Sequence, residues 1–101
     1  MVCYNATKEA IRGITRTAAR EWGQYGIAVN VICPMSETDT LATYRVEQPE
    51  AYAAMEASIP MRRIGNATRD LAPLMIFLAG DGAGYMTGMT FMVEGGTNMF
   101  P

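Results

Sequence analysis

The chain has 101 residues, enough for one small domain. Half of its residues are hydrophobic and its formal net charge is -2, which is typical of a globular protein with no electrostatic attraction to nucleic acid or anionic lipid. It has two cysteines, far apart, and no histidine, which argues against a metal site and against Ser-His or Cys-His nucleophilic catalysis. The same cysteine content indicates reduced thiols, as in the cytoplasm, and no apolar run is long enough to span a membrane.

The first predicted element is a helix over residues 3–22. Apolar side chains recur at spacings of three and four and form one stripe along it. The stripe consists of Ile11, Ile14, Ala18 and Trp22. Gly23 and Gly26 are expected to end the helix.

Tyr4 and Lys8 lie near the start of this predicted helix, four residues apart, so their side chains share one face. A free tyrosine is a poor base at neutral pH, but a nearby ammonium group favours its phenolate form. Such a pair can give or take a proton at an alcohol or carbonyl oxygen. The same spacing also arises by chance in many helices, so the pair alone leaves a purely structural interpretation open.

The next two segments differ in composition. Residues 27–33 are almost wholly apolar and are followed by Pro34, which predicts a strand buried on both faces of a parallel sheet. Residues 35–60 open with polar side chains and continue in a loose helical pattern that Pro49 interrupts, which predicts two short helices. A long segment without a strong core stripe is typical of a mobile lid that contacts substrate.

The last third of the chain is predicted to hold a helix and a strand. Pro73 lacks the N–H that a helix interior uses, so either the helix starts near Asp70 or it kinks at the proline. Five of its apolar residues are expected to be mostly buried: Leu71, Leu74, Met75, Phe77 and Leu78. The alternating glycines of residues 80–84 follow this helix and precede a strand at residues 89–93. Since a dinucleotide-binding turn follows a strand and opens a helix, no nucleotide site is expected there. Residues 94–96 read as a turn and residues 97–101 as a short tail.

Taken in order, these landmarks resemble the short-chain dehydrogenase/reductase family. They are Tyr-x-x-x-Lys on a helix, a buried strand ending in Asn-Val-Ile-Cys-Pro, a polar lid, Pro-Met-Arg-Arg-Ile-Gly, a buried helix, Tyr-Met-Thr-Gly, a strand and Val-Glu-Gly-Gly. The likeness covers essentially the whole chain. It implies an α/β fold in which residues 1–101 are the C-terminal portion of a doubly wound parallel-sheet (Rossmann-type) domain, supplying two strands with flanking helices.

The resemblance implies an oxidoreductase that transfers a hydride between NAD or NADP and a secondary alcohol or ketone. In the family the tyrosine is the catalytic acid/base, and the lysine stabilises the phenolate and binds the nicotinamide ribose. These roles fall on Tyr4 and Lys8. The partners implied are a small alcohol or carbonyl substrate and further copies of the chain in a dimer or tetramer, with no nucleic acid and no membrane.

The segment after the predicted buried strand is expected to line the nicotinamide. Pro34 and Met35 stand where the family has a Pro-Gly pair, so Met35 departs from the usual glycine. The threonine that contacts the carboxamide is expected at Thr38 or Thr40, which flank the family's position, and we favour Thr38. Substrate contacts are expected from three residues of this region: Met35, Ser36 and Tyr44.

Several parts on which the family depends lie before its tyrosine and have no room here. They are the glycine-rich turn, the residue that selects NAD or NADP, a helical asparagine and the catalytic serine. We therefore expect residues 1–101 to be a fragment that lacks the cofactor-binding half and is inactive alone. Two other functions stay open: an epimerase or dehydratase of the extended branch, against which the closing Val-Glu-Gly-Gly argues, and a non-catalytic module for subunit contacts.

Overall fold

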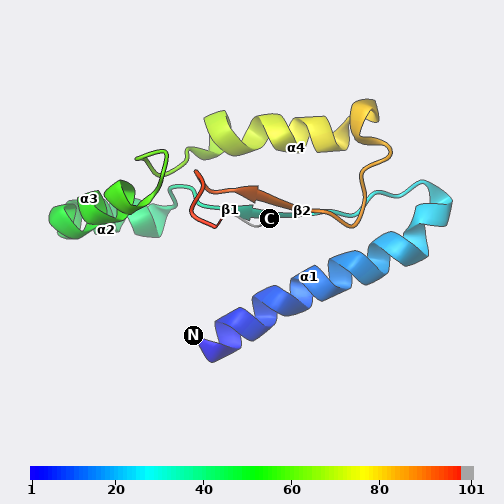
Figure 1. Ribbon diagram of the computed structural model, residues 1–101, viewed down its shortest axis with the longest axis horizontal. Helices are drawn as coiled ribbons and strands as arrows, with labels where there is room; N and C mark the ends of the chain where they lie inside the picture. The colour runs from blue at the N-terminus through cyan, green and yellow to red at the C-terminus, as the bar shows by residue number, and fades with distance from the viewer. Residues whose placement is uncertain (99–101) are drawn as a thin grey trace. The chain divides into compact units, whose positions relative to one another are not determined.

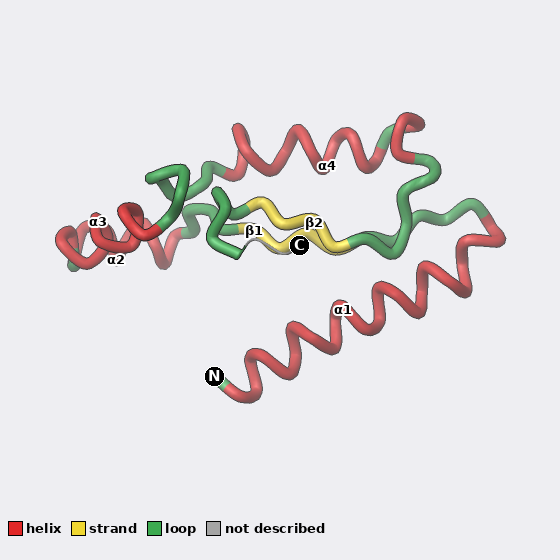
Figure 2. The backbone as a smooth tube through the Cα atoms, in the orientation of Figure 1, coloured by secondary structure: helices red, strands yellow, loops and turns green. Residues whose placement is uncertain are grey.

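The computed structural model describes residues 1–98 of the chain. Its elements follow in the order α1 (Val2–Trp22), a 3-10 turn (Gly23–Tyr25), β1 (Val31–Pro34), α2 (Asp39–Glu47), α3 (Pro49–Ser58), a π-helical turn (Ala67–Leu71), α4 (Ala72–Ala79), a 3-10 turn (Asp81–Ala83) and β2 (Thr90–Val93) (Figures 1 and 2). Two compact parts are present. The first part comprises Met1–Ile32 and Ile76–Phe91, and the second part comprises Cys33–Met75 and the described residues from Met92 on.

β1 and β2 lie side by side as a parallel pair (Figure 1). The Val31 N–H donates to the Met89 carbonyl at 3.0 Å, and the Met35 N–H donates to the Val93 carbonyl at 2.9 Å. Both partners advance in the same direction, as parallel strands require. The carboxyl ends of the two strands therefore meet at one edge, which is the edge where open parallel sheets bind ligands.

The strand predicted over residues 27–33 is wrong at its start, because β1 begins at Val31 and is half-buried rather than buried on both faces. Before that point, side chains take part in the hydrogen bonds between the two segments. The Val29 N–H donates to the Thr87 hydroxyl, and the Asn30 side chain donates to the Met86 carbonyl and accepts from the Met89 N–H. Because side-chain hydrogen bonds compete with the strand ladder, an apolar run does not by itself set a strand's length. The second strand matches its prediction to within one residue.

Of the predicted apolar stripe of α1, Ala18 is buried and the other three members are exposed. Ile14 is 67% exposed and Trp22 is 46% exposed. The buried positions of the helix carry small side chains: Thr15, Ala18 and Ala19. Small side chains allow a close approach of other backbone, and a Cβ on Gly88 would lie 3.4 Å from the Cβ of Ala19.

The start of the last helix is confirmed, but the burial of its apolar residues is not. A π-helical turn over Ala67–Leu71 leads into α4, and Pro73 is the second residue of α4. Met75 is 57% exposed and Phe77 is 47% exposed, while three leucines are half-buried. A helix that is apolar on all faces is normally buried on several sides. The two strands β1 and β2 have too little surface to bury all faces of α4. No helix among residues 1–98 is long and apolar enough to cross a bilayer.

The second part has a hydrophobic core of its own. The two helices predicted on either side of Pro49 are confirmed as α2 and α3, which pack against each other. This segment, predicted to have no strong core stripe, nevertheless contributes to the core. Tyr52, Ile59 and Ile64 are buried together, and three half-buried side chains pack against them: Met35, Leu41 and Met55. The tail predicted over residues 97–101 lies, from residue 99 on, outside the described residues.

Candidate functional site

Tyr4 and Lys8 form the first group of candidate residues and lie in the first part of the molecule. α1 begins at Val2, so Tyr4 stands in its first turn and Lys8 one turn later. The Lys8 Nζ lies 5.4 Å from the centre of the Tyr4 ring, within the range of a cation–π contact. Tyr4 is 58% exposed. The prediction that the two side chains share one helix face is therefore confirmed. The Tyr4 hydroxyl and the Lys8 ammonium group are both on an exposed part of α1.

The second group follows β1, at the carboxyl edge of the strand pair, and lies in the second part. Pro34 closes β1 and is exposed, whereas Met35 is half-buried and packs on the core. Ser36 pairs with Gly65 in a parallel bridge. Around this bridge the Gly65 N–H donates to the Met35 carbonyl at 3.0 Å, and the Glu37 N–H donates to the Gly65 carbonyl at 2.9 Å. The backbone of residues 35–37 is thus held on both of its sides.

Thr38 and Thr40 differ in how firmly the structure fixes them. Thr38 is the N-cap of α2, and its Oγ1 accepts a hydrogen bond from the Leu41 N–H at 3.3 Å. This contact uses the oxygen as an acceptor, so the hydroxyl hydrogen can still be donated to another group. Thr40 lies in the first turn of α2 and, like Thr38, is exposed. Tyr44 lies further along α2 and is 37% exposed.

Glu37 organises a cluster that the sequence did not reveal. Its Oε1 lies 3.0 Å from Nη1 of Arg45 on α2 and 3.4 Å from the hydroxyl of Tyr52 on α3. The Arg45 guanidinium in turn lies 5.8 Å from the centre of the Tyr52 ring. Burial raises the pKa of the Tyr52 phenol, and the Glu37 carboxylate raises it further. Tyr52 is therefore a neutral hydrogen-bond donor that ties α3 to the segment after β1.

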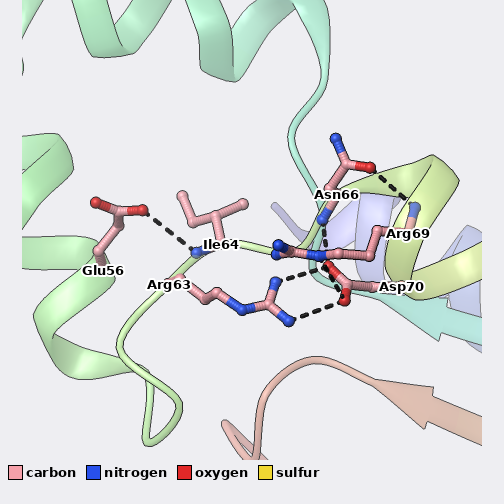
Figure 3. Close-up of polar contacts among 6 residues, drawn as sticks. All are labelled: Glu56, Arg63, Ile64, Asn66, Arg69 and Asp70. Atoms are coloured by element: carbon pink, nitrogen blue, oxygen red, sulfur yellow. Dashed lines mark hydrogen bonds and ion pairs between the residues drawn. The ribbon is translucent and has the colours of Figure 1, made fainter.

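A second polar cluster surrounds Asp70 (Figure 3). Arg63 binds this carboxylate with both guanidinium nitrogens, at 2.6 and 2.8 Å, and the Asn66 N–H donates to it at 2.6 Å. Arg69 approaches at 3.4 Å through Nε. Hydrogen bonding from Arg63, with support from the Asn66 N–H, holds the pKa of Asp70 well below its usual range. Asp70 is therefore an ionised, fully engaged carboxylate and is not available as a general base.

A cavity of about 200 Å³ opens beside Asp70. Its lining residues come from the two sides of the Gly65 bridge and from the end of β2: Met35, Met61, Arg63, Gly65, Asp70, Val93 and Gly95. Met35 and Met61 line this cavity, whereas Tyr52 and Met55 belong to the core. The two arginines of Pro-Met-Arg-Arg-Ile-Gly are visible in the sequence. Their spacing from Asp70 does not identify Asp70 as the partner of Arg63.

The sequence matches a family described as enoyl-(acyl carrier protein) reductase over residues 1–98. It is similar to a 12alpha-hydroxysteroid dehydrogenase from a Clostridium species, with 40% identity over 98 residues that cover 97% of this chain and 38% of that protein. It is also similar to the 3-oxoacyl-(acyl-carrier-protein) reductase FabG of Pseudomonas aeruginosa, with 42% identity over 98 residues and the same 38% share of the relative. The chain thus spans well under half the length of the relatives that it matches.

Solved structures give the same result. The TT0495 protein from Thermus thermophilus superposes with a TM-score of 0.83 at 38% identity, over 96% of this chain and 40% of that one. The Pseudomonas aeruginosa RhlG/NADP active-site complex superposes with a TM-score of 0.82 at 35% identity, over 95% of this chain and 38% of that one. The parallel strands and their helices are therefore arranged as in a large set of α/β proteins.

Proposed function

Since this chain belongs to the short-chain dehydrogenase/reductase family and has the α/β fold of its C-terminal portion, we propose that it carries the proton-transfer half of an NAD(P)-dependent oxidoreductase. The reaction is reversible hydride transfer between NAD or NADP and a secondary alcohol or ketone. The observation that carries this proposal is the pairing of Tyr4 with Lys8 on one exposed face of α1. Relatives described as dehydrogenases and as reductases favour this chemistry over epimerisation.

Tyr4 moves the proton in this proposal. In the oxidative direction its phenolate takes the proton of the substrate hydroxyl as the carbon–hydrogen bond breaks, and in the reductive direction its phenol returns that proton to the new alkoxide oxygen. Lys8 lies beside Tyr4 on the same helix face, with its Nζ 5.4 Å from the centre of the ring. When bound, NAD(P) supplies or accepts the hydride.

The donors on this chain fit a nicotinamide nucleotide. Lys8 offers N–H donors for the ribose hydroxyls, on the same face as the reacting tyrosine. Thr38 keeps a free hydroxyl hydrogen at a fixed helix start, suited to the carboxamide oxygen, while Thr40 is the alternative. Pro34 and Met35 lie at the carboxyl edge of the pair formed by β1 and β2. On the substrate side we propose Met35, Ser36 and Tyr44.

The pyrophosphate of the cofactor needs a glycine-rich turn between a strand and a helix. Residues 1–98 contain no such turn: the glycines of residues 80–84 follow α4 and precede β2. We propose that a further polypeptide segment, in cis or in trans, supplies it, and that residues 1–101 alone do not turn over substrate. This chain together with that segment is called the complete enzyme.

The test compares Tyr4→Phe with Tyr25→Phe in the complete enzyme. Both changes remove one exposed phenolic hydroxyl, but Tyr25 lies in the 3-10 turn beyond the end of α1. Tyr4→Phe is expected to lower turnover by about a hundredfold or more, because general acid–base catalysis contributes about 10²–10⁴-fold. NADPH or NADH binding, followed by nicotinamide fluorescence, should be kept in both variants. Turnover by Tyr4→Phe equal to that of Tyr25→Phe would assign proton transfer to another group.

A further inference from the structure

Gly65 fixes the backbone of the segment that follows β1. Its N–H donates to the Met35 carbonyl and its carbonyl accepts from the Glu37 N–H, with Ser36 paired between them. The two backbones are so close that a Cβ on Gly65 would stand 2.7 Å from the Met35 oxygen, a distance that real Cβ atoms essentially never show. The position of residues 35–38 therefore depends on the position of Gly65.

One carboxylate holds the residues on both sides of Gly65. Asp70 receives two hydrogen bonds from Arg63, which precedes Gly65 by two residues, and one from the N–H of Asn66, which follows it (Figure 3). The Asp70 side chain is only 19% exposed. Two parallel N–H···O contacts fix both the distance and the orientation of Arg63 and Asp70. A lysine in place of Arg63 cannot make this two-point contact. The Arg63–Asp70 pair thus closes the loop of residues 63–70 around Gly65.

We propose that Arg63 and Asp70 are positioning residues for the nicotinamide side of the site, a role that rests on the proposed function. The pair holds Gly65, and Gly65 sets the backbone of residues 35–38, which carries Met35 and Thr38. Arg63 and Asp70 act through this backbone and do not touch the reacting atoms.

Contacts other than this pair hold α2, α3 and most of their core together, although Ile64 of the same loop belongs to that core. The side chain of Glu37 is held separately by Arg45 and Tyr52, and the core around Tyr52 and Ile59 is apolar. Breaking the Arg63–Asp70 pair should therefore loosen the backbone at Gly65 while α2, α3 and their core stay folded. The expected result is weaker cofactor binding rather than a lost fold.

The experiment uses the complete enzyme and three changes around one carboxylate. Asp70→Asn and Arg63→Met should each raise the KM and the Kd for the nicotinamide cofactor about tenfold, which corresponds to about 1.4 kcal/mol. Arg63→Lys should lie between Arg63→Met and the unaltered enzyme. The kcat at saturating cofactor should change by less than about threefold, because bound cofactor restores the segment. Arg69→Met is the matched control: Arg69 approaches the same carboxylate at 3.4 Å, is 65% exposed, and should leave both constants unchanged.

Amide hydrogen exchange gives a readout that needs no turnover. In Asp70→Asn the amides of Gly65 and Glu37 should exchange faster, while the Gly88 amide, which donates to the Val29 carbonyl at 2.7 Å, should not change. Gly65→Ala should displace the Met35 carbonyl without removing the Arg63–Asp70 pair, and should raise the cofactor KM in the same way. This variant keeps the test decisive if Asp70→Asn fails to fold.

Unchanged cofactor affinity in folded Asp70→Asn and Gly65→Ala, with Tyr4→Phe inactive, would overturn the positioning role and leave the proposed function standing. Retained turnover in Tyr4→Phe together with lost cofactor affinity in Asp70→Asn would reject the proposed proton transfer and keep the positioning role.

Discussion

Gly95 lies so close to Ile59 that a Cβ on the glycine would stand 2.7 Å from the Cγ2 atom of the isoleucine. Ile59 is the most deeply buried large side chain of the second part, at 1% exposure. Gly95 has a φ of +65°, a conformation that glycine adopts without strain, and its carbonyl accepts from the Met61 N–H at 3.2 Å. The turn after β2 is thus packed directly on the core that supports α3.

Gly95→Ala should lower the free energy of unfolding of the complete enzyme by about 1–3 kcal/mol, the usual cost of overpacking a core. The added methyl group would stand 2.7 Å from a buried side chain, and the positive φ adds strain. Urea denaturation checks this through a lower midpoint at an unchanged slope. An unchanged midpoint would mean that the turn shifts away from Ile59 at no cost.

Gly13→Ala is the opposite case and serves as the matched variant. Gly13 lies inside α1, and a Cβ there would meet nothing within 4 Å. Alanine in a helix interior is favoured over glycine by about 0.5–1 kcal/mol. The same denaturation experiment should therefore show a higher midpoint. Destabilisation by Gly13→Ala would show that another surface covers α1 at this position.

Local signals in the sequence were enough to predict most elements of the fold. The regular spacing in residues 3–22 predicts α1, Pro49 separates α2 from α3, and the glycines after Val93 predict the turn. Each of these features depends on residues close together in the chain. The shared face of Tyr4 and Lys8 is of the same kind, since a spacing of four fixes it in any helix.

Features that depend on distant residues were missed. Arg63 and Asp70 meet because a loop closes around Gly65, and Glu37 reaches Arg45 and Tyr52 only after α2 and α3 have folded back. No periodicity marks such partners. The exposed apolar residues of α1 (Ile11, Ile14 and Trp22) and of α4 have a related cause. Apolar spacing predicts that a helix face is buried, but does not identify the surface that buries it.

The cofactor threonine can be identified by comparing Thr38→Ala with Thr40→Ala. Thr38→Ala removes the N-cap of α2 and should cost about 1 kcal/mol of stability. If Thr38 also donates to the carboxamide, as proposed, the cofactor KM should rise as well. Thr38→Ser keeps the hydroxyl and should restore both the stability and the KM, whereas Thr40→Ala should alter neither. A KM increase confined to Thr40→Ala would place the cofactor contact further along α2.

The Arg63–Asp70 pair should also be visible in the acid stability of the protein. The folded state holds the pKa of Asp70 below the usual value of 3.8, because Arg63 and the Asn66 N–H stabilise the ionised carboxylate. A carboxyl group with a lowered folded-state pKa adds stability that is complete above its unfolded-state pKa and is lost as the pH falls towards the folded-state pKa. The difference in unfolding free energy between the unaltered protein and Asp70→Asn should therefore be constant from neutral pH down to about pH 5 and should shrink progressively below 3.8. Glu9→Gln, which breaks an exposed pair between Glu9 and Arg12 at 3.1 Å, is the control and should show little difference at any pH. Urea titrations at a series of pH values measure both differences. If the difference between the unaltered protein and Asp70→Asn stays constant down to pH ~2, the partners of Asp70 do not lower its pKa in the folded state.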